Sequence, residues 1–455
     1  MCMLNESASA HSQQSPVDFS LFEDDFLEQS ASDDHIELQE IVASVMSIEK
    51  VTFYPSGDES IFAKGIVLPG QQSGLIATFE GRLLIGSEKA YDQLDALLEP
   101  KNQMPVFRED IRKVERFDKT VHVIHILDHR IQASVRPWWP NLLLFIATFL
   151  SVIVTGALQS GEIASIEALT SDLTLLRHGL PYGLGLMTII VAHEFGHYWA
   201  ARRHNLNVTL PYFIPLPFGL FGTLGAFIQL REPMRNRKVL MEVGAAGPLA
   251  GLIFALPILI VGLLLSEVMP IPTNEPTFTE GNSILYLLTK LIIFGRILPS
   301  GGEDVFIHPL AFAGWVGLLI TSLNLIPVGQ LDGGHILYSL IGHRAKALYY
   351  PILIALFLLA VTVSPLWFLW VALLFLFGQV HAVPLDAITK LDPRRRLISI
   401  VSLVIFVLIF MPIPFSFNNP QTDGTPPRRD RNTIENNYQP TLLANESFNG
   451  VTIVE

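Results

Sequence analysis

The chain has 455 residues, of which 50% are hydrophobic and only 16% are charged, and its formal net charge is -12. Soluble domains carry roughly 25% charged residues on average. This deficit, together with a mean hydropathy of +0.42, indicates a membrane protein. The single cysteine, Cys2, excludes a disulfide within the chain and a cysteine-based zinc site, so His and carboxylate side chains would have to hold any metal.

The first 45 residues contain ten Asp or Glu and no Lys or Arg. Too few of them are apolar to offset the entropy lost on ordering, so residues 1–45 are predicted to be a disordered acidic leader. An acidic N-terminus is unlike a secretory signal or a transit peptide. It also lacks the basic surface that phosphate binding needs, so nucleic acid is not an expected partner.

Residues 46–135 are predicted to form a small soluble α/β domain. Segments rich in β-branched and aromatic residues, separated by Gly and Pro, predict strands at 51–54, 62–68, 75–85 and 121–127. Apolar residues at helical spacing predict a helix over 87–99. No residues in this domain have the spacing of a catalytic motif.

From about residue 140 onward the chain is dominated by apolar segments. A helix needs roughly 20 apolar residues to cross the hydrocarbon core of a bilayer. Candidate spans are read at 140–158, 179–200, 239–265, 309–328, 346–363, 364–380 and 397–415. The predicted fold is therefore a polytopic α-helical membrane protein with about seven spans, in which a membrane domain over 136–416 follows the soluble domain and precedes a polar C-terminal tail over 417–455.

The loops between these spans differ in basic charge. The loop 201–238 contains six Lys or Arg and the loop 381–396 contains four, whereas 159–178 contains only Arg177. The positive-inside rule places the basic loops, and with them the N-terminal domain, in the cytoplasm. We expect an integral multi-pass protein of a bacterial cytoplasmic membrane.

The second candidate span contains the sequence H-E-F-G-H at residues 193–197. Positions i and i+4 share one face of a helix, so His193 and His197 can bind one zinc ion while Glu194 acts on a bound water. Ionisable groups inside a membrane are costly and usually functional. The alternative is a cluster near the lipid headgroups that has no metal.

A catalytic zinc site takes three protein ligands, and a third is expected from another apolar span. Asp332 closes the fourth candidate span, in the sequence N-L-I-P-V-G-Q-L-D-G-G-H. Pro327 breaks the helix before it. Irregular backbone at membrane depth is tolerated where it is buried or lines a wet cavity, which predicts an internal polar site. The alternative places Asp332 in a turn near the headgroups.

The motifs H-E-x-x-H and N-x-x-P-x-x-x-L-D-G resemble those of the site-2 protease family of intramembrane zinc metalloproteases, over a core of roughly 179–340. The resemblance implies that His193, His197 and Asp332 bind one zinc ion and that Glu194 is the catalytic base. It places Asn324 near the site, where it steadies the substrate or the oxyanion. No segment resembles the PDZ domain of many bacterial members, so the chain is more similar to the plastid and cyanobacterial type.

Three further segments have expected roles. His335 follows the Asp332 turn and is a candidate for orienting the carboxylate. The small residues of 246–251, A-G-P-L-A-G, are expected to let helices approach closely. Residues 208–230 are apolar but rich in Pro and Gly, which excludes a regular span and resembles the membrane-dipping hairpin of the family. We hypothesise that its edge at 222–230 captures an extended substrate by β-augmentation.

The function implied is intramembrane zinc-dependent endoproteolysis of transmembrane segments. The expected partners are single-span membrane protein substrates, the lipid bilayer and an upstream site-1-type protease. One alternative is a non-catalytic scaffold or chaperone on the same fold, for which a broken motif would be expected. A metal transporter is a second alternative, but transporters usually have internal repeats, and none is visible.

Overall fold

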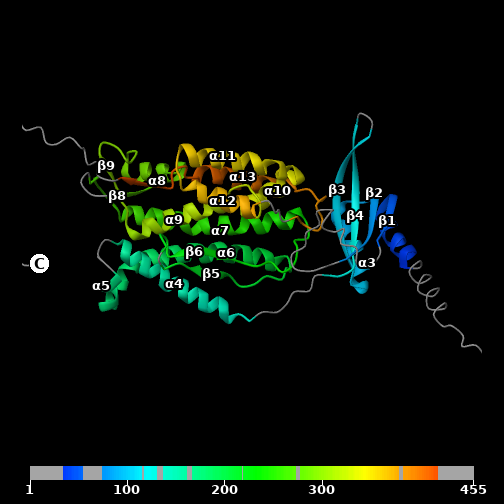
Figure 1. The fold of residues 1–455 in the computed structure, drawn as a ribbon, viewed down its shortest axis with the longest axis horizontal. Coiled ribbons are helices and arrows are strands. Elements are labelled where there is room, and N and C mark those ends of the chain that lie inside the picture. Colours follow the sequence, from blue (N-terminus) through cyan, green and yellow to red (C-terminus); the bar gives the residue numbers. More distant parts are fainter. Residues whose placement is uncertain are drawn as a thin grey trace, which may run out of the picture. The chain divides into compact units, whose positions relative to one another are not determined.

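An antiparallel four-stranded sheet carries the N-terminal part of the chain in the computed structural model, which describes residues 34–54, 74–114, 117–130, 137–160, 166–217, 219–272, 277–378 and 383–418. The strand order is β1-β2-β4-β3 (Figure 1). The bounds are β1 Met46–Phe53, β2 Leu75–Leu83, β3 Met104–Val114 and β4 Phe117–Leu127. A helix over 34–43 and α3 (Ser87–Leu98), which leads into the short helix η1 (Glu99–Lys101), contribute to the same apolar core as the strands.

This sheet differs in part from the sequence prediction. The structure has the helix expected at 87–99 as α3, and the strand expected at 121–127 lies within β4. The strand expected at 75–85 is β2, which ends at Leu83. The expected strand 51–54 is the end of a longer β1, β3 was not predicted, and 62–68 lies outside the described residues. The disordered leader was wrong for residues 34–43, where Leu38 and Val42 are buried and hold a helix in the core.

Four helical segments are long and apolar enough to cross a membrane. They are Trp139–Gln159, Leu173–Arg203, Arg237–Leu264 and Asp332–Thr362. Three shorter apolar helices lie at Ile284–Phe294, Pro309–Asn324 and Trp367–Leu376. Length and composition are thus those of a polytopic membrane protein, whereas the count of seven spans stays a prediction. The fourth predicted span, 309–328, ends as a helix at Asn324, and the helix over 284–294 was not predicted at all.

The helices of this region have the following bounds: α4 Trp139–Gln159, α5 Ile166–Ser171, η2 Leu173–Gly179, α6 Leu180–Arg203, α7 Arg237–Leu264, α8 Ile284–Phe294, α9 Pro309–Asn324, α10 Asp332–Ile341, η3 Gly342–Leu348, α11 Tyr349–Thr362, α12 Trp367–Phe377 and α13 Pro393–Ile409. Short strands pair as β5 (Tyr212–Pro215) with β6 (Thr223–Phe227), β7 (Glu267–Pro270) with β9 (Glu303–Phe306), and β8 (Thr277–Glu280) with β10 (Phe415–Asn418). The contacts divide the chain into a larger unit, 1–271 with 280–416, and a small one, 272–279 with 417–455; the features described below lie in the larger unit.

Helices α6, α7 and α9 pack side by side at the centre of this region (Figure 1). Glycines make the approach possible. A Cβ added at Gly314 of α9 would lie 2.6 Å from the Leu259 Cα of α7, and one at Gly262 of α7 would lie 2.1 Å from the Ala311 nitrogen. Small residues allow helix backbones to approach in this way, and the result is a rigid three-helix core.

The segment between α6 and α7 is a β-hairpin anchored on α4. As predicted for 208–230, the described residues of this segment form no helix, and β5 and β6 pair antiparallel with Phe213 opposite Ala226. The Asn141 carboxamide of α4 donates to the carbonyls of Leu210 (2.8 Å) and Pro211 (3.1 Å), and Ser151 Oγ donates to the Gly222 carbonyl (2.6 Å). The Asn141 bonds satisfy two backbone carbonyls at the start of the hairpin, and Ser151 adds a second donor to the Gly222 carbonyl, which also accepts from Leu216 N–H (3.0 Å).

We expect Asn141→Ala to lower the free energy of unfolding by about 1–3 kcal/mol, because two carbonyls would lose their donor at a side chain that is only 6% exposed. The measurement is equilibrium unfolding in mixed micelles. Thr188→Ala is the matched control, since the Thr188 hydroxyl bonds only within its own helix and is exposed. Equal stability of the Asn141 variant and the wild type would show that the hairpin is held by other contacts.

Residues 384–389 connect the sheet to the start of α7. The Phe107 N–H of β3 donates to the Leu385 carbonyl (2.8 Å), and the Ala387 N–H donates to the Phe107 carbonyl (3.2 Å). On its other side the segment donates from Asp386 N–H to the Arg235 carbonyl (2.7 Å). Asn236 then caps α7 by accepting from Lys238 N–H (3.0 Å). The sheet edge and the N-terminus of α7 therefore share one strand-like segment.

Candidate metal centre

Three side chains that were predicted as metal ligands meet in one buried cluster. His193 and His197 lie on α6, and Asp332 is the first residue of α10. The distance from His193 Nε2 to His197 Nε2 is 3.2 Å, and Asp332 Oδ2 lies 3.3 Å from each of them. Both imidazoles are buried. Asp332 is thus brought to two histidines that precede it by 135 and 139 positions in the sequence, through the packing of α6 against the elements around the start of α10.

The Asp332 position differs from the expected one in its local structure. We expected it to close the fourth span, but α9 ends at Asn324 and Asp332 instead begins α10. The backbone between them turns at Gly329, whose φ is +61°. Gly333 is packed so closely that an added Cβ would lie 2.0 Å from the Leu325 carbonyl oxygen. The helix break that the proline predicted is therefore present, and it directs the carboxylate toward α6.

Helix α7 fixes the orientation of His197. The Nδ1 of His197 donates to the Val243 carbonyl (2.7 Å). With the proton on Nδ1, the neutral imidazole presents an unprotonated Nε2 to the cluster. Gly247, one turn further along α7, faces the same ring, and a Cβ added there would lie 2.0 Å from His197 Nε2. The predicted small-residue segment thus makes room for a ligand as well as for helix packing.

The donor set fits a zinc ion. Two nitrogens and one carboxylate oxygen are typical catalytic zinc ligands, and a tetrahedral ion with bonds of about 2.0–2.1 Å holds its ligand atoms roughly 3.3 Å apart. The three distances of 3.2, 3.3 and 3.3 Å match that spacing. Without a cation, two unprotonated imidazole nitrogens so close to each other would repel. The cluster can therefore hold one metal ion and leave a fourth position for water.

Glu194 lies beside this cluster on α6 and is 5% exposed. Its carboxylate is within hydrogen-bonding reach of the backbone N–H of Ile228, just after β6. A cavity of about 220 Å³ is lined by all three ligands and Glu194, and also by Ala226, Phe227 and Ile228. The hairpin therefore forms one wall of the space in which a substrate carbonyl would meet the metal.

The remaining two candidates also line this cavity. Asn324 Nδ2 lies 3.3 Å from His193 Nε2, so its carboxamide faces the cluster from the end of α9. His335 lies one turn into α10, and its Cβ packs against Gly244 of α7. Sequence reasoning missed Val243 and Ile228, because both act through backbone atoms that no side-chain motif reveals. Gly247 was noted only as part of a packing segment.

Comparison with known proteins agrees with this geometry. The sequence model of Peptidase family M50 matches residues 182–361. The chain is 31% identical over 264 residues to a protein of Arabidopsis thaliana named "Probable zinc metalloprotease EGY2, chloroplastic", covering 57% of this chain and 46% of that protein. The protein of the same name in Oryza sativa subsp. indica is 31% identical over 295 residues, with coverages of 63% and 52%.

A third relative, named "Probable zinc metalloprotease EGY1, chloroplastic" and found in Oryza sativa subsp. japonica, is 30% identical over 296 residues, with coverages of 60% and 50%. The chain spans about half the length of the curated relatives it matches. The matched range 182–361 contains the whole cluster together with Glu194, Asn324 and His335. Residues 182–361 therefore match the model of Peptidase family M50, and the chain is homologous to plant proteins that are named probable zinc metalloproteases.

Proposed function

We propose that this chain is an intramembrane zinc metalloendopeptidase that cleaves transmembrane segments of membrane proteins. The observation that carries the proposal is the buried group of His193, His197 and Asp332 with Glu194 beside it, placed within helices whose length and composition suit a membrane. Homologues named zinc metalloproteases support the choice of metal and reaction.

In this proposal His193, His197 and Asp332 hold the ion, which when bound lowers the pKa of a water and polarises a carbonyl. Glu194 takes a proton from the attacking water and passes it to the leaving amine. The Asn324 carboxamide donates a hydrogen bond to the oxygen on which negative charge develops. His335 helps to position α10 and its carboxylate against α7.

The hairpin supplies the surface for an extended substrate. In the described part of the chain, β6 pairs with β5 only, so its second edge is available to another strand. A helical substrate must unwind before its peptide bond is accessible, and pairing along β6 would hold the unwound segment beside the cavity. The side chains of Leu224 and Phe227 on β6 are exposed, 67% and 48%, and are free to contact such a segment.

We expect Ile228→Pro to reduce turnover at least about tenfold without loss of metal. Proline lacks the N–H that faces Glu194 and cannot extend the pairing edge. Turnover of a fused single-span substrate and bound zinc would be measured on the same preparation. Ile228→Val keeps the N–H and serves as the control. Unchanged turnover of the proline variant would contradict substrate capture at this edge.

The arrangement in the membrane is part of the proposal. We propose seven spans, with the basic loops and the N-terminal sheet on the cytoplasmic side; single-span proteins are the proposed substrates, and an upstream site-1-type protease is a proposed partner. The relatives are named as chloroplastic proteins, so their names do not support a bacterial membrane as the location of this chain. Because Cys2 is the only cysteine, single cysteines placed in each loop of a Cys2→Ser background would report sidedness through labelling by an impermeant reagent.

The test of function compares the membrane proteome of the native host carrying the wild type with that of the host carrying Glu194→Gln. We expect one or a few single-span proteins to accumulate in the mutant, each cut within its span in the wild type. The scaffold alternative predicts no such accumulation and normal behaviour of the mutant. Identical proteomes under several stress conditions, with the zinc site intact, would favour the scaffold.

A further inference from the structure

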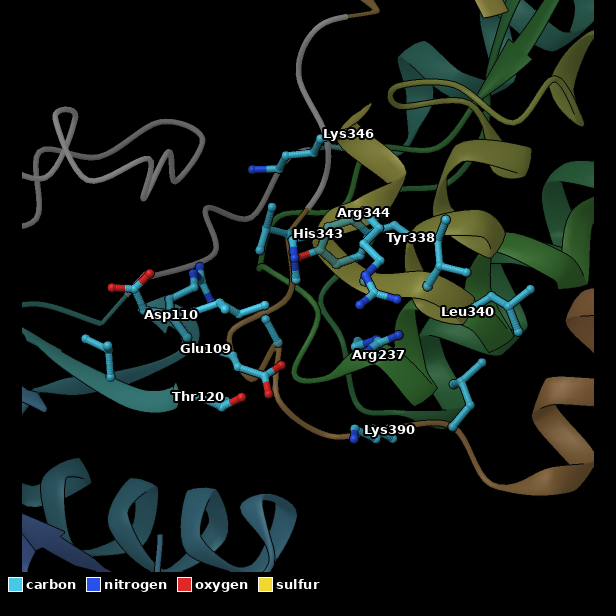
Figure 2. Close-up of a pocket in the computed structure, with 18 of the residues that line it drawn as sticks. Glu109, Asp110, Thr120, Arg237, Tyr338, Leu340, His343, Arg344, Lys346 and Lys390 are labelled. Carbon is cyan, nitrogen blue, oxygen red and sulfur yellow. The ribbon is translucent and has the colours of Figure 1, made fainter. Parts of the chain in front are cut away.

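A second and larger cavity has a volume of about 990 Å³ (Figure 2). It shares no lining residue with the cavity at the metal cluster. One wall is formed by residues of strands β2, β3 and β4, and the other by the start of α7, the end of α10, η3 and residues 383–396. Small-molecule sites have volumes of about 300–1,000 Å³, so this space is large enough for a ligand. It contains none of the residues to which we assign the peptidase reaction.

The cavity is lined by six basic side chains, which are Arg108, Arg237, Arg344, Lys346, Lys390 and Arg396. All but Arg108 come from the helical wall, and Figure 2 shows Arg237, Arg344 and Lys390 around the same space. Among the residues that the structure describes, none of the six has a carboxylate as ion-pair partner. Some basic residues elsewhere do have such a partner, for example Lys238 with Glu88 (2.7 Å) and Arg296 with Glu303 (2.7 Å).

Arg237 lies deep in this wall. It is only 8% exposed, and its Nε and Nη2 both donate to the Ser339 carbonyl, at 3.0 and 2.7 Å. The guanidinium is thus bonded to a neutral carbonyl, and among the described residues Glu109 and Asp386 act on it without forming an ion pair. Burying a charge without such a direct partner is costly. A bound anion would remove that cost, since guanidinium groups bind phosphate oxygens well.

Arg108, on β3, likewise directs its guanidinium hydrogen bonds to backbone carbonyls. Its Nη1 donates to the backbone carbonyls of Phe107 (2.8 Å), Pro384 (2.9 Å) and Leu385 (3.0 Å). Desolvation by burial lowers the pKa of Arg108 to about 10, so the side chain is still charged at neutral pH. Tyr338 lines the cavity as well, and its hydroxyl makes no hydrogen bond to any residue in the described ranges, so it can donate to a ligand.

The sheet wall is different in charge. Glu80, Glu109 and Asp110 line the cavity there, and Figure 2 shows Glu109 and Asp110 across from the labelled arginines. These carboxylates disfavour an anion on their own side and accept hydrogen bonds from hydroxyl or amino groups. The two walls therefore suit a molecule with a phosphate at one end and hydroxyl or amino groups at the other.

We propose that this cavity binds a phosphate-bearing molecule, with its phosphate on the wall of Arg237, Arg344 and Lys346. A soluble phosphorylated metabolite and an anionic lipid headgroup share that chemistry. This site goes beyond the proposed peptidase function, because binding would require neither the metal cluster nor Glu194.

The full chain would be reconstituted in phosphatidylcholine nanodiscs and titrated with inorganic phosphate by calorimetry. In parallel, nanodiscs containing phosphatidic acid would be analysed by native mass spectrometry for retained lipid. The test variant is Arg344→Gln with Lys346→Gln, at two exposed positions where folding should persist. The control is Arg202→Gln with Arg203→Gln, which removes the same charge from exposed positions outside the cavity.

We expect phosphate to bind the wild type and the control alike, and the test variant about tenfold or more weakly. If only phosphatidic acid is retained, and the test variant loses it, the source of the phosphate is a lipid headgroup. The proposal is overturned if neither probe binds, or if the wild type and the test variant bind both equally. Equal binding by the wild type and the test variant would be expected if phosphate bound at the metal cluster instead.

Discussion

Replacing Glu194 by Gln is expected to reduce cleavage of a transmembrane substrate by about 10²–10⁴-fold, the range for loss of a general base. The change keeps the size of the side chain and removes only its ability to take a proton. Because the proposed ligands are His193, His197 and Asp332, with mutual distances of 3.2–3.3 Å, bound zinc should stay at the wild-type level. The measurement is turnover of a fused single-span substrate together with zinc content by elemental analysis.

Glu267→Gln is the control for this prediction, since that carboxylate is exposed and lies outside the metal-site cavity. Its turnover should equal that of the wild type. Loss of zinc from the Glu194 variant would mean that the carboxylate serves the metal rather than the proton transfer. Full activity with full zinc would remove Glu194 from the reaction and make the scaffold alternative the better explanation.

The second large effect is expected from Gly247→Ala, a change of one methyl group in a helix that alanine normally favours. The added Cβ would lie 2.0 Å from His197 Nε2, far inside contact distance. The ring must move, and its bond to the Val243 carbonyl cannot hold it in the ligand position. Since losing an outer-shell partner of a ligand already costs 10–100-fold in metal affinity, we expect displacement of the ligand itself to cost more than about 100-fold.

Alanine substitutions at two other glycines are controls for this prediction. At Gly251 an added Cβ would lie 3.3 Å from His193, so Gly251→Ala should weaken zinc binding only slightly. At Gly86 nothing lies within 4 Å, so Gly86→Ala should leave zinc binding unchanged. Zinc affinity would be measured by competition with a chelating dye. Wild-type affinity in Gly247→Ala would show that α7 does not hold the His197 ring as closely as the distances indicate.

The sequence predicted those features that depend on the residue type itself, such as ionisable side chains within apolar segments. His at i and i+4 on a helix, a Glu between them and an Asp after a proline break are chemically unusual in apolar segments, so His193, Glu194, His197 and Asp332 could be predicted before any fold was known. Apolar length likewise predicted α4, α6 and α7, within a few residues at each end, as helices long and apolar enough to cross a membrane.

Other features were not readable because their meaning depends on neighbours. Helix α8, of 11 residues, was missed, whereas α9 and α12, of 16 and 11 residues, lie within the candidate spans 309–328 and 364–380. Helices this short can be spans or buried or interfacial helices, so length alone does not decide between them. The residues 34–43 looked too polar to order by themselves. Their few apolar side chains become sufficient only because the sheet provides a surface to cover.

The sequence by itself predicted the membrane class, the candidate ligands and the candidate base, because these depend on composition and on local helical spacing. Only the tertiary structure decided that the Val243 carbonyl sets the His197 ring, that Gly247 leaves room for it, and that the hairpin faces Glu194. The structure alone also showed the basic cavity between β3 and α7. Backbone groups and empty space have no sequence signature, since they arise only when distant segments pack together.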